Sequence, residues 1–140
     1  MEHDMLPYIG IDLVSIPRVR DMIDTSFDAT VGRMLRSNEL AACHRAGRLD
    51  AVSVAGKLAI KEAVFKVFRS RGDPLPWTDI QVQAEEGAAP SVSLDGRARA
   101  LANAARIGDD ISISLTHERD YAIAVAVAFC SSNRLVTNQP

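Results

Sequence analysis

Hydrophobic and polar residues alternate with a period of two in some segments and recur with a helical period in others, which is typical of an α+β protein. Strands are predicted over residues 8–16, 79–83, 91–94, 111–115 and 121–129, the second and third forming a hairpin. Helices are predicted over residues 18–22, 38–45 and 52–68 and from residue 96 to 105 or 106. The segment 52–68 is apolar on every side, as a buried helix is. We therefore expect an antiparallel sheet wrapped on a long buried helix.

Residues that favour helix ends set the expected boundaries of the helices. Asp50 is expected to cap the long central helix, and Asp95 the helix that follows the hairpin. Ser37 or Asn38 is expected to cap the helix over 38–45. These residue types are favoured because their side-chain oxygens accept hydrogen bonds from the free backbone N–H groups of the first turn.

The last predicted strand carries alanine at every second position and larger apolar residues between them. Side chains alternate between the two faces of a strand, so one face of this strand is made of alanine alone. The alanines are Ala122, Ala124, Ala126 and Ala128. A face with such small side chains lets another element pack very close.

Length and composition set the class of protein. With 140 residues and 47% apolar content, the chain can form one domain, expected over residues 1–130 and followed by a polar, frayed tail over 131–140. The net charge of −2 gives no overall preference for nucleic acid or an anionic membrane. Two distant cysteines, Cys43 and Cys130, fit a reducing compartment, and no long apolar run indicates a leader or a membrane span. We expect a cytoplasmic protein without nucleic-acid or membrane partners.

Charged residues within apolar elements are the candidates for chemistry. Asp12 interrupts the first strand, and Lys57, Lys61, Glu62 and Lys66 lie on the central helix. Buried charges need a partner, a metal or a bound anion. One interpretation is an ion pair between Glu62 and Lys66, which are one helical turn apart. The other is a metal and phosphate site, since Mg²⁺ takes one or two carboxylates and completes its shell with water and substrate phosphates.

Other chemistries are not supported by the sequence. The pair Gly56-Lys57 lies inside a helix, and the glycine that a P-loop needs at position 51 is alanine. Ser114 and His117 are not part of a nucleophile elbow. Glu39 has no assigned role, so Glu39→Ala is expected to be nearly silent.

Four blocks of residues together resemble the holo-acyl-carrier-protein synthases, the small phosphopantetheinyl transferases. The blocks are Gly10-Ile11-Asp12 with Arg18, Lys61-Glu62-Ala63-x-x-Lys66, Trp77-x-Asp79-Ile80, and Ser112-Ile113-Ser114-Leu115-Thr116-His117 followed by Tyr121-Ala122-x-Ala124. The resemblance extends from about residue 9 to 129, nearly the whole chain, and implies the 4′-phosphopantetheinyl transferase fold.

The resemblance implies transfer of 4′-phosphopantetheine from coenzyme A to a serine of an apo acyl carrier protein, with release of adenosine 3′,5′-bisphosphate. It implies that Asp12 and Glu62 bind Mg²⁺ and that Lys66 contacts the pyrophosphate, so that Glu62 and Lys66 are the catalytic residues. It places His117 near the nucleotide and Lys57 near the 3′-phosphate of coenzyme A. It also implies that Arg18 contacts the carrier and that the protein is a homotrimer.

Several alternatives stay open at this level. The serine proton could pass to Glu62 or to a metal-bound water, and Arg18 and His117 could be ordinary solvated residues. The carrier could serve fatty-acid or polyketide synthesis, and the chain could be a non-catalytic module that binds coenzyme A or a carrier protein. The segment Arg69-Ser70-Arg71 replaces the glycine-rich turn of the family. Because bulky residues are strained at positive φ, we expect this loop to follow a different path.

Overall fold

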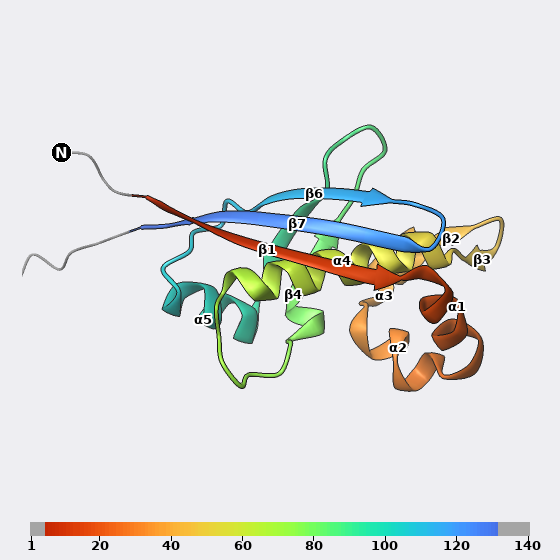
Figure 1. Ribbon diagram of the computed structural model, residues 1–140. Helices are drawn as coiled ribbons and strands as arrows, with labels where there is room; N and C mark the ends of the chain where they lie inside the picture. Colours follow the sequence, from red (N-terminus) through yellow and green to blue (C-terminus); the bar gives the residue numbers. More distant parts are fainter. Residues whose placement is uncertain (1–4, 132–140) are drawn as a thin grey trace, which may run out of the picture.

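A three-stranded antiparallel sheet lies across one long helix and forms the centre of the molecule (Figure 1). The computed structural model describes residues 5–131. The sheet contains β1 (Leu6–Ser15), β7 (Tyr121–Cys130) and β6 (Ser112–His117) in that order, and the helix is α4 (Ala51–Val67). The predicted α+β architecture, with an antiparallel sheet packed on a long buried helix, is confirmed.

Shorter elements gather around the two ends of α4 (Figure 1). α1 (Ile16–Thr25), η1 (Phe27–Ala29), α2 (Val31–Met34) and α3 (Ser37–Ala42) follow β1, and a small ribbon of β2 (His44–Arg45) and β3 (Arg48–Leu49) leads into α4. After α4 come η2 (Trp77–Asp79), the predicted hairpin of β4 (Ile80–Gln83) and β5 (Ser91–Leu94), and α5 (Gly96–Ala104).

The alanine face of β7 is the surface on which α4 packs. All four alanines of this face are completely buried. Near its first turns α4 approaches β6, where a Cβ on Gly56 would lie 3.0 Å from the side chain of Leu115. Near its end α4 approaches β1, where a Cβ on Gly10 would overlap the carbonyl oxygen of Ala63. The predicted close packing is therefore confirmed, and α4 crosses beneath the sheet from β6 to β1.

Most element boundaries differ from the prediction by one to three residues, and two of the differences have a clear structural cause. Ile16 begins α1 instead of ending the first strand, because the hydroxyl of Ser15 caps the helix by accepting the backbone N–H of Arg18 at 3.3 Å. The helix predicted over 38–45 ends at Ala42, and His44 and Arg45 form β2. The reversal at Ala46 and Gly47, both with positive φ, turns the chain back into a short ribbon.

The predicted caps are correct for α4 only. Asp50 accepts the backbone N–H of Ser53 at 3.2 Å, as expected. Arg36, and neither of the two predicted residues, occupies the N-cap position of α3, and Glu39 accepts its backbone N–H at 2.9 Å. Asp95 occupies the N-cap position of α5 without capping it, because Asp79 accepts the backbone N–H of the second helical residue.

Glu39, to which the sequence assigns no role, is a buried structural residue. Its side chain is fully buried, and it forms an ion pair of 2.8 Å with Lys61, which is also fully buried. Removing one partner would leave an unpaired buried charge, which is strongly destabilising. The expectation that Glu39→Ala is silent is therefore wrong.

The loop after α4 also departs from the expectation. Arg69 adopts a positive φ of 53°, the conformation that we expected an arginine to avoid. Its guanidinium carbon lies 4.0 Å from the centre of the Tyr8 ring, a cation–π contact that offsets part of the backbone strain.

Among residues 5–131 there is no helix long and apolar enough to cross a membrane. The predicted tail lies outside the described residues, apart from Ser131.

Candidate active site

Two carboxylates meet where β1 and α4 are in closest contact. Asp12 lies on the same face of β1 as Gly10, because side chains two residues apart share a face of a strand. Glu62 precedes Ala63, the residue whose carbonyl oxygen abuts Gly10. The glycine therefore lets the strand approach the helix closely enough for Asp12 and Glu62 to interact.

Lys66 completes this group on α4, one turn after Glu62. Its Nζ forms an ion pair with Asp12 Oδ1 at 3.1 Å and donates to the carbonyl oxygen of Ile11 at 2.8 Å. Lys66 therefore forms its ion pair with a residue of β1. The predicted alternative, an ion pair between Glu62 and Lys66 on the same helix, is not present in the part of the chain that the structure describes. The side chain of Lys66 is 55% exposed, so its ammonium can also reach a ligand.

The second oxygen of Asp12 lacks a donor when both carboxylates are ionised. Oδ2 is buried and has no hydrogen-bond partner among the described residues. A buried acceptor without a donor is costly, and the proton of a neutral Glu62 or a cation between the two carboxylates would satisfy it. The pair is therefore built for a proton or a metal ion.

The pKa of Glu62 is raised to about 7 from its ordinary value of 4.5. Burial is the main cause, followed by a hydrogen bond to Asp12 and by the negative charge of Asp12. The positive charges of Lys66 and Arg18 act in the opposite direction. A shared proton relieves the repulsion between two close carboxylates, and a cation bound between them would do the same.

Arg18 lies beside this group on the exposed surface of α1. Its charge acts on Glu62, so the structure brings Asp12, Glu62, Lys66 and Arg18 to one side of α4. Four of the six residues singled out in the sequence are thereby brought together.

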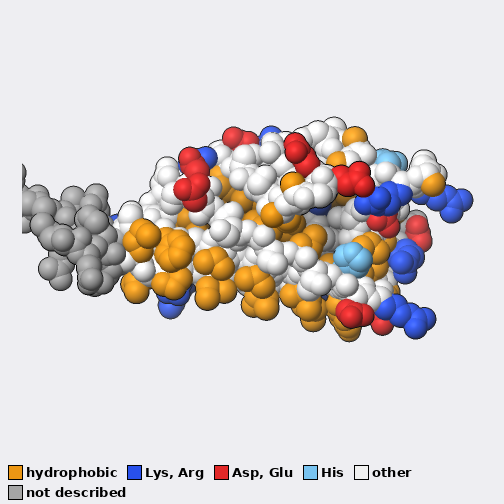
Figure 2. Space-filling view, turned by 90° about the horizontal axis from the view of Figure 1, so that it is seen from above, with side chains coloured by type: hydrophobic (Ala, Val, Ile, Leu, Met, Phe, Trp, Pro, Cys, Tyr) orange, Lys and Arg blue, Asp and Glu red, His pale blue; other side chains and the backbone are white. Residues whose placement is uncertain are grey.

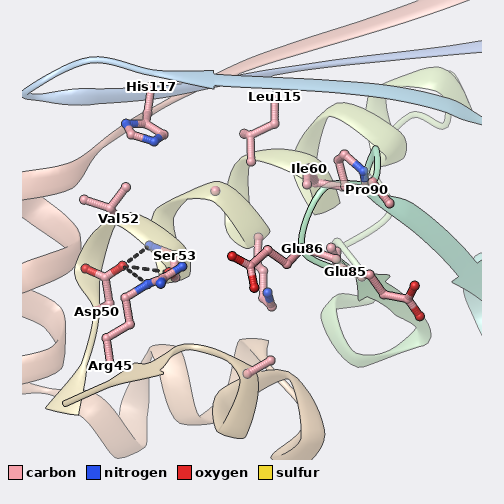
Figure 3. A pocket seen from close by; sticks show the side chains of 16 residues that line it. Arg45, Asp50, Val52, Ser53, Ile60, Glu85, Glu86, Pro90, Leu115 and His117 are labelled. Atoms are coloured by element: carbon pink, nitrogen blue, oxygen red, sulfur yellow. Dashed lines mark hydrogen bonds and ion pairs between the residues drawn. The ribbon is translucent and has the colours of Figure 1, made fainter. Parts of the chain in front are cut away.

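Lys57 and His117 line a cleft on the other side of α4 (Figure 3). The cleft has a volume of about 740 Å³ and lies between the first turns of α4, β6 and the loop that joins β4 to β5. Because residues 57 and 62 are five positions apart, they point about 140° away from each other around the helix. One chain therefore presents the predicted residues as two separate groups.

The cleft contains cationic groups that could bind a phosphate. Lys57 is only 7% exposed and forms no hydrogen bond or ion pair with any residue in the described part of the chain. Arg45 approaches from β2, with its Nε 3.3 Å from Asp50 Oδ2. Ser53 donates its hydroxyl hydrogen to the same oxygen at 2.7 Å. A desolvated ammonium facing a cleft favours an anionic ligand.

Some residues of the cleft are not indicated by the sequence. Arg45 was assigned to a helix, and nothing in the residue pattern indicates that the chain reverses and carries it to the cleft. Glu85 and Glu86 come from the loop between β4 and β5, and Figure 3 shows Glu86 directed into the cleft. Besides Lys57 and His117, the sequence indicates Asp50 in this region, as the cap of the central helix.

Comparison with known proteins agrees with the fold. Residues 8–126 match the family described as the 4′-phosphopantetheinyl transferase superfamily. The holo-[acyl-carrier-protein] synthase of Chlorobaculum parvum is 35% identical over 120 residues, which are 85% of this chain and 95% of that protein.

Solved structures give the same result. The crystal structure of the Helicobacter pylori holo-[acyl-carrier-protein] synthase in complex with coenzyme A matches with a TM-score of 0.70 and 30% identity, over 86% of this chain and 98% of that chain. The Plasmodium yoelii holo-ACP-synthase matches with a TM-score of 0.75 and 26% identity, over 94% of this chain and 99% of that chain.

The fold and the matches together define a 4′-phosphopantetheinyl transferase. Within that superfamily the chain belongs to the holo-[acyl-carrier-protein] synthases, enzymes that transfer phosphopantetheine from coenzyme A to an acyl carrier protein.

Proposed function

We propose that the transfer takes place at the Asp12–Glu62 pair and depends on Mg²⁺. A serine hydroxyl of the carrier attacks the phosphorus next to pantetheine, a serine O–P bond forms, and the bond to the bridging oxygen of the pyrophosphate breaks. Adenosine 3′,5′-bisphosphate leaves. The observation that carries the proposal is the buried, unpartnered Oδ2 of Asp12 beside a Glu62 of raised pKa.

The residues present fit a magnesium ion. Asp12 and Glu62 supply two carboxylates, and one or two are what Mg²⁺ takes from a protein when phosphates complete its shell. When bound, the ion would neutralise charge on the transferring phosphoryl group.

Lys66 and Glu62 act on the reacting groups directly. The exposed ammonium of Lys66 binds the pyrophosphate and stabilises the charge that develops on the leaving group. Glu62 is a candidate to accept the serine proton, because it is a carboxylate one helical turn from Lys66, and a water bound to the metal is the other candidate. Binding the two substrates in line supplies the rest of the rate enhancement through positioning.

The decisive test is mass spectrometry of an apo acyl carrier protein incubated with the chain, coenzyme A and Mg²⁺. The proposal predicts that the carrier gains the mass of one phosphopantetheine and that chelation of the metal prevents this gain. Binding of coenzyme A without any gain would favour the alternative of a non-catalytic module. A cytoplasmic location remains a prediction from the sequence.

The raised pKa of Glu62 predicts a pH-dependent stability of the metal-free protein. Since the folded state holds the Glu62 proton more tightly than the unfolded state, this residue makes the free energy of unfolding fall as pH rises from about 4.5 to about 7. Mg²⁺ competes with that proton. Calorimetry should therefore show a larger rise in melting temperature on addition of Mg²⁺ at pH 8 than at pH 5.5.

The matched variant for this test is Glu62→Gln, which cannot ionise. It should remove both the pH dependence assigned to Glu62 and most of the response to Mg²⁺. An equal response to Mg²⁺ at both pH values in the wild-type protein would contradict the assignment.

We further propose that the protein is a homotrimer in which each site is shared between two subunits. The separation of the predicted residues into two groups on opposite sides of α4 supports this arrangement, because the helix lies between the two groups of a single chain. A head-to-tail interface that closes into a ring brings one group of each subunit to the other group of its neighbour.

The outer face of the sheet supports the same proposal. On β1, Ile9, Ile11 and Leu13 are 63%, 58% and 56% exposed, on the face opposite α4. Their partners across β7 are Val127, Val125 and Ile123. Figure 2 shows this face, with hydrophobic side chains along the length of the sheet. A continuous apolar surface of this kind is typical of a protein–protein interface.

Subunit mixing tests the shared site. We expect Glu62→Gln and the double variant Lys57→Gln/His117→Ala to be inactive or weakly active alone. Mixed trimers refolded from both should regain part of the activity, because some sites then receive the intact group from each subunit. Light scattering would give the oligomeric state, and a monomer or an absence of any recovery would refute the proposal.

Arg18 is proposed to bind the acidic carrier. The reversal Arg18→Glu should raise the KM for the carrier by about 10-fold or more and that for coenzyme A much less, with a weaker dependence on salt. Arg20→Glu is the matched control, because Arg20 points about 160° away on the same helix. Steady-state kinetics with each substrate varied in turn would measure both effects. Equal changes in the two KM values would show that Arg18 does not select the carrier.

A further inference from the structure

A buried ion pair connects α4 to the part of the protein that forms the far wall of the cleft. Lys61 lies on α4 and Glu39 on α3, their side chains are 0% exposed, and Nζ lies 2.8 Å from Oε1. The Lys61 ammonium also donates to the carbonyl oxygen of Trp77 at 2.7 Å. Lys61 immediately precedes Glu62, yet it points to the interior and contacts neither the carboxylate site nor the solvent.

Glu39 uses both of its oxygens to hold backbone groups. Oε1 accepts the N–H of Arg36 at 2.9 Å in addition to the Lys61 ammonium. Oε2 accepts the N–H of Val82 at 2.9 Å. The carboxylate therefore connects the start of α3, the middle of β4 and α4, and we call this set of bonds the joint.

Arg36 extends the joint to the surface of the protein. Its Nη2 forms an ion pair of 3.1 Å with Asp95, and its guanidinium also donates to the Thr78 carbonyl oxygen and to Gln81 Oε1. Thr78 and Gln81 flank the start of β4. The bonds to Thr78 and Gln81 act on β4 and the residues that lead into it, and the ion pair with Asp95 connects Arg36 to the start of α5.

The residues fixed in this way form the wall of the cleft opposite β6. Val82 lines the cleft from β4, and Ala42 lines it from α3, one turn beyond Glu39. The loop that follows β4 carries Glu86 into the cleft (Figure 3). The opposite wall is held differently, because β6 is paired with β7, and α4 packs on the alanine face of β7.

We propose that the Lys61–Glu39 pair is a positioning device that sets the width of the cleft, and thereby the affinity for the nucleotide portion of coenzyme A. The inference rests on the proposed function, because it takes the cleft as the site of that portion. A buried pair is a costly way to join two elements, and apolar residues of similar size often give equal or greater stability. What the pair supplies is a defined geometry at three backbone positions, which an apolar contact would leave loose.

The test is a double variant, Glu39→Gln/Lys61→Met, in which no buried charge is left unpaired. The glutamine side chain retains an oxygen for one of the two backbone N–H groups, and the methionine side chain fills the volume of the lysine stem, so the variant should fold with the other backbone position released. Coenzyme A binding is measured by calorimetry, and the two KM values and kcat by steady-state kinetics. We expect the Kd and KM for coenzyme A to rise by about 10-fold or more, with kcat and the carrier KM within about 2-fold.

Arg36→Met is a second variant that loosens the same wall from its exposed end. It should raise the KM for coenzyme A in the same direction by about 3-fold. Arg97→Met removes a surface ion pair with Asp73 that is outside this joint, and it should leave both KM values unchanged. If the double variant does not fold, the comparison of Arg36→Met with Arg97→Met decides the matter.

Each outcome bears on one hypothesis. A folded double variant that binds coenzyme A as the wild type does would overturn the inference, as would an Arg36→Met variant indistinguishable from Arg97→Met. A fall in kcat with unchanged affinity would also overturn it, because Lys61 would then act on Glu62. Failure of the wild-type protein to bind coenzyme A would instead refute the proposed function.

Discussion

Glu62→Gln is expected to lower turnover by at least about 10²-fold, because it removes one of the two charged ligands that would hold Mg²⁺. Asp12→Asn should have an effect of similar size. Glutamine and asparagine keep the shape of the carboxylates, so the loss would report on charge and not on packing. Melting curves taken alongside initial rates with saturating Mg²⁺ would verify that both variants fold.

Asp28→Asn is the control for these variants. Asp28 is a carboxylate in η1, far along the chain from both acids and with no hydrogen bond or ion pair to another described residue, so its replacement should leave turnover unchanged. Coenzyme A should still bind to Glu62→Gln through the cleft on the opposite side of α4. Near wild-type turnover in Glu62→Gln would remove both the metal site and the proposed base at once.

Sequence pattern predicts the centre of this fold well because local rules govern it. The central helix is apolar all round, and β7 alternates alanine with larger residues. The residue pattern of each element therefore shows which of its faces are buried. Asp12 and Glu62 could be singled out because an acid in such an element requires an explanation. The predicted helix caps are wrong where another residue binds the expected capping side chain or takes its place. Arg36 binds the Asp95 carboxylate, and Asp79 caps α5 in its place.

Long-range partners could not be read from the chain. Lys61 pairs with Glu39 across 22 positions, and periodicity does not identify which charge meets a buried lysine. For the same reason the sequence assigns no role to Glu39, because its spacing within α3 is ordinary. Arg69 shows the same limit at the level of the backbone. Its positive φ is maintained by a tertiary contact with Tyr8, which lies on the first strand.

Gly10→Ala is expected to be among the most damaging single-methyl changes in the chain. A Cβ at this position would overlap the Ala63 carbonyl oxygen, lie 2.9 Å from its carbon and lie 3.2 Å from Lys66 Cβ. The obstacle is mostly helix backbone, which cannot rotate away as a flexible side chain can. β1 and α4 must therefore separate, at a cost of about 1–3 kcal/mol in the free energy of unfolding.

The same separation would damage the active site. Asp12 is on the moving strand and Glu62 on the helix, so the two carboxylates would move apart together with their backbones. A displacement of about 1 Å can cost about 10²-fold in rate when geometry controls the reaction. Gly10→Ala should therefore lose about 10²-fold in turnover, even at a temperature where denaturation curves show that it is folded.

Gly108→Ala is the matched control, since a Cβ there meets no atom within 4 Å and should change neither stability nor rate. Denaturant unfolding and initial rates on both variants distinguish the two consequences of the close approach. Loss of stability with normal turnover would mean that the strand shifts without moving Asp12. Wild-type values for both would mean that β1 and α4 are not in contact at Gly10, and the account of how the carboxylates are brought together would then be wrong.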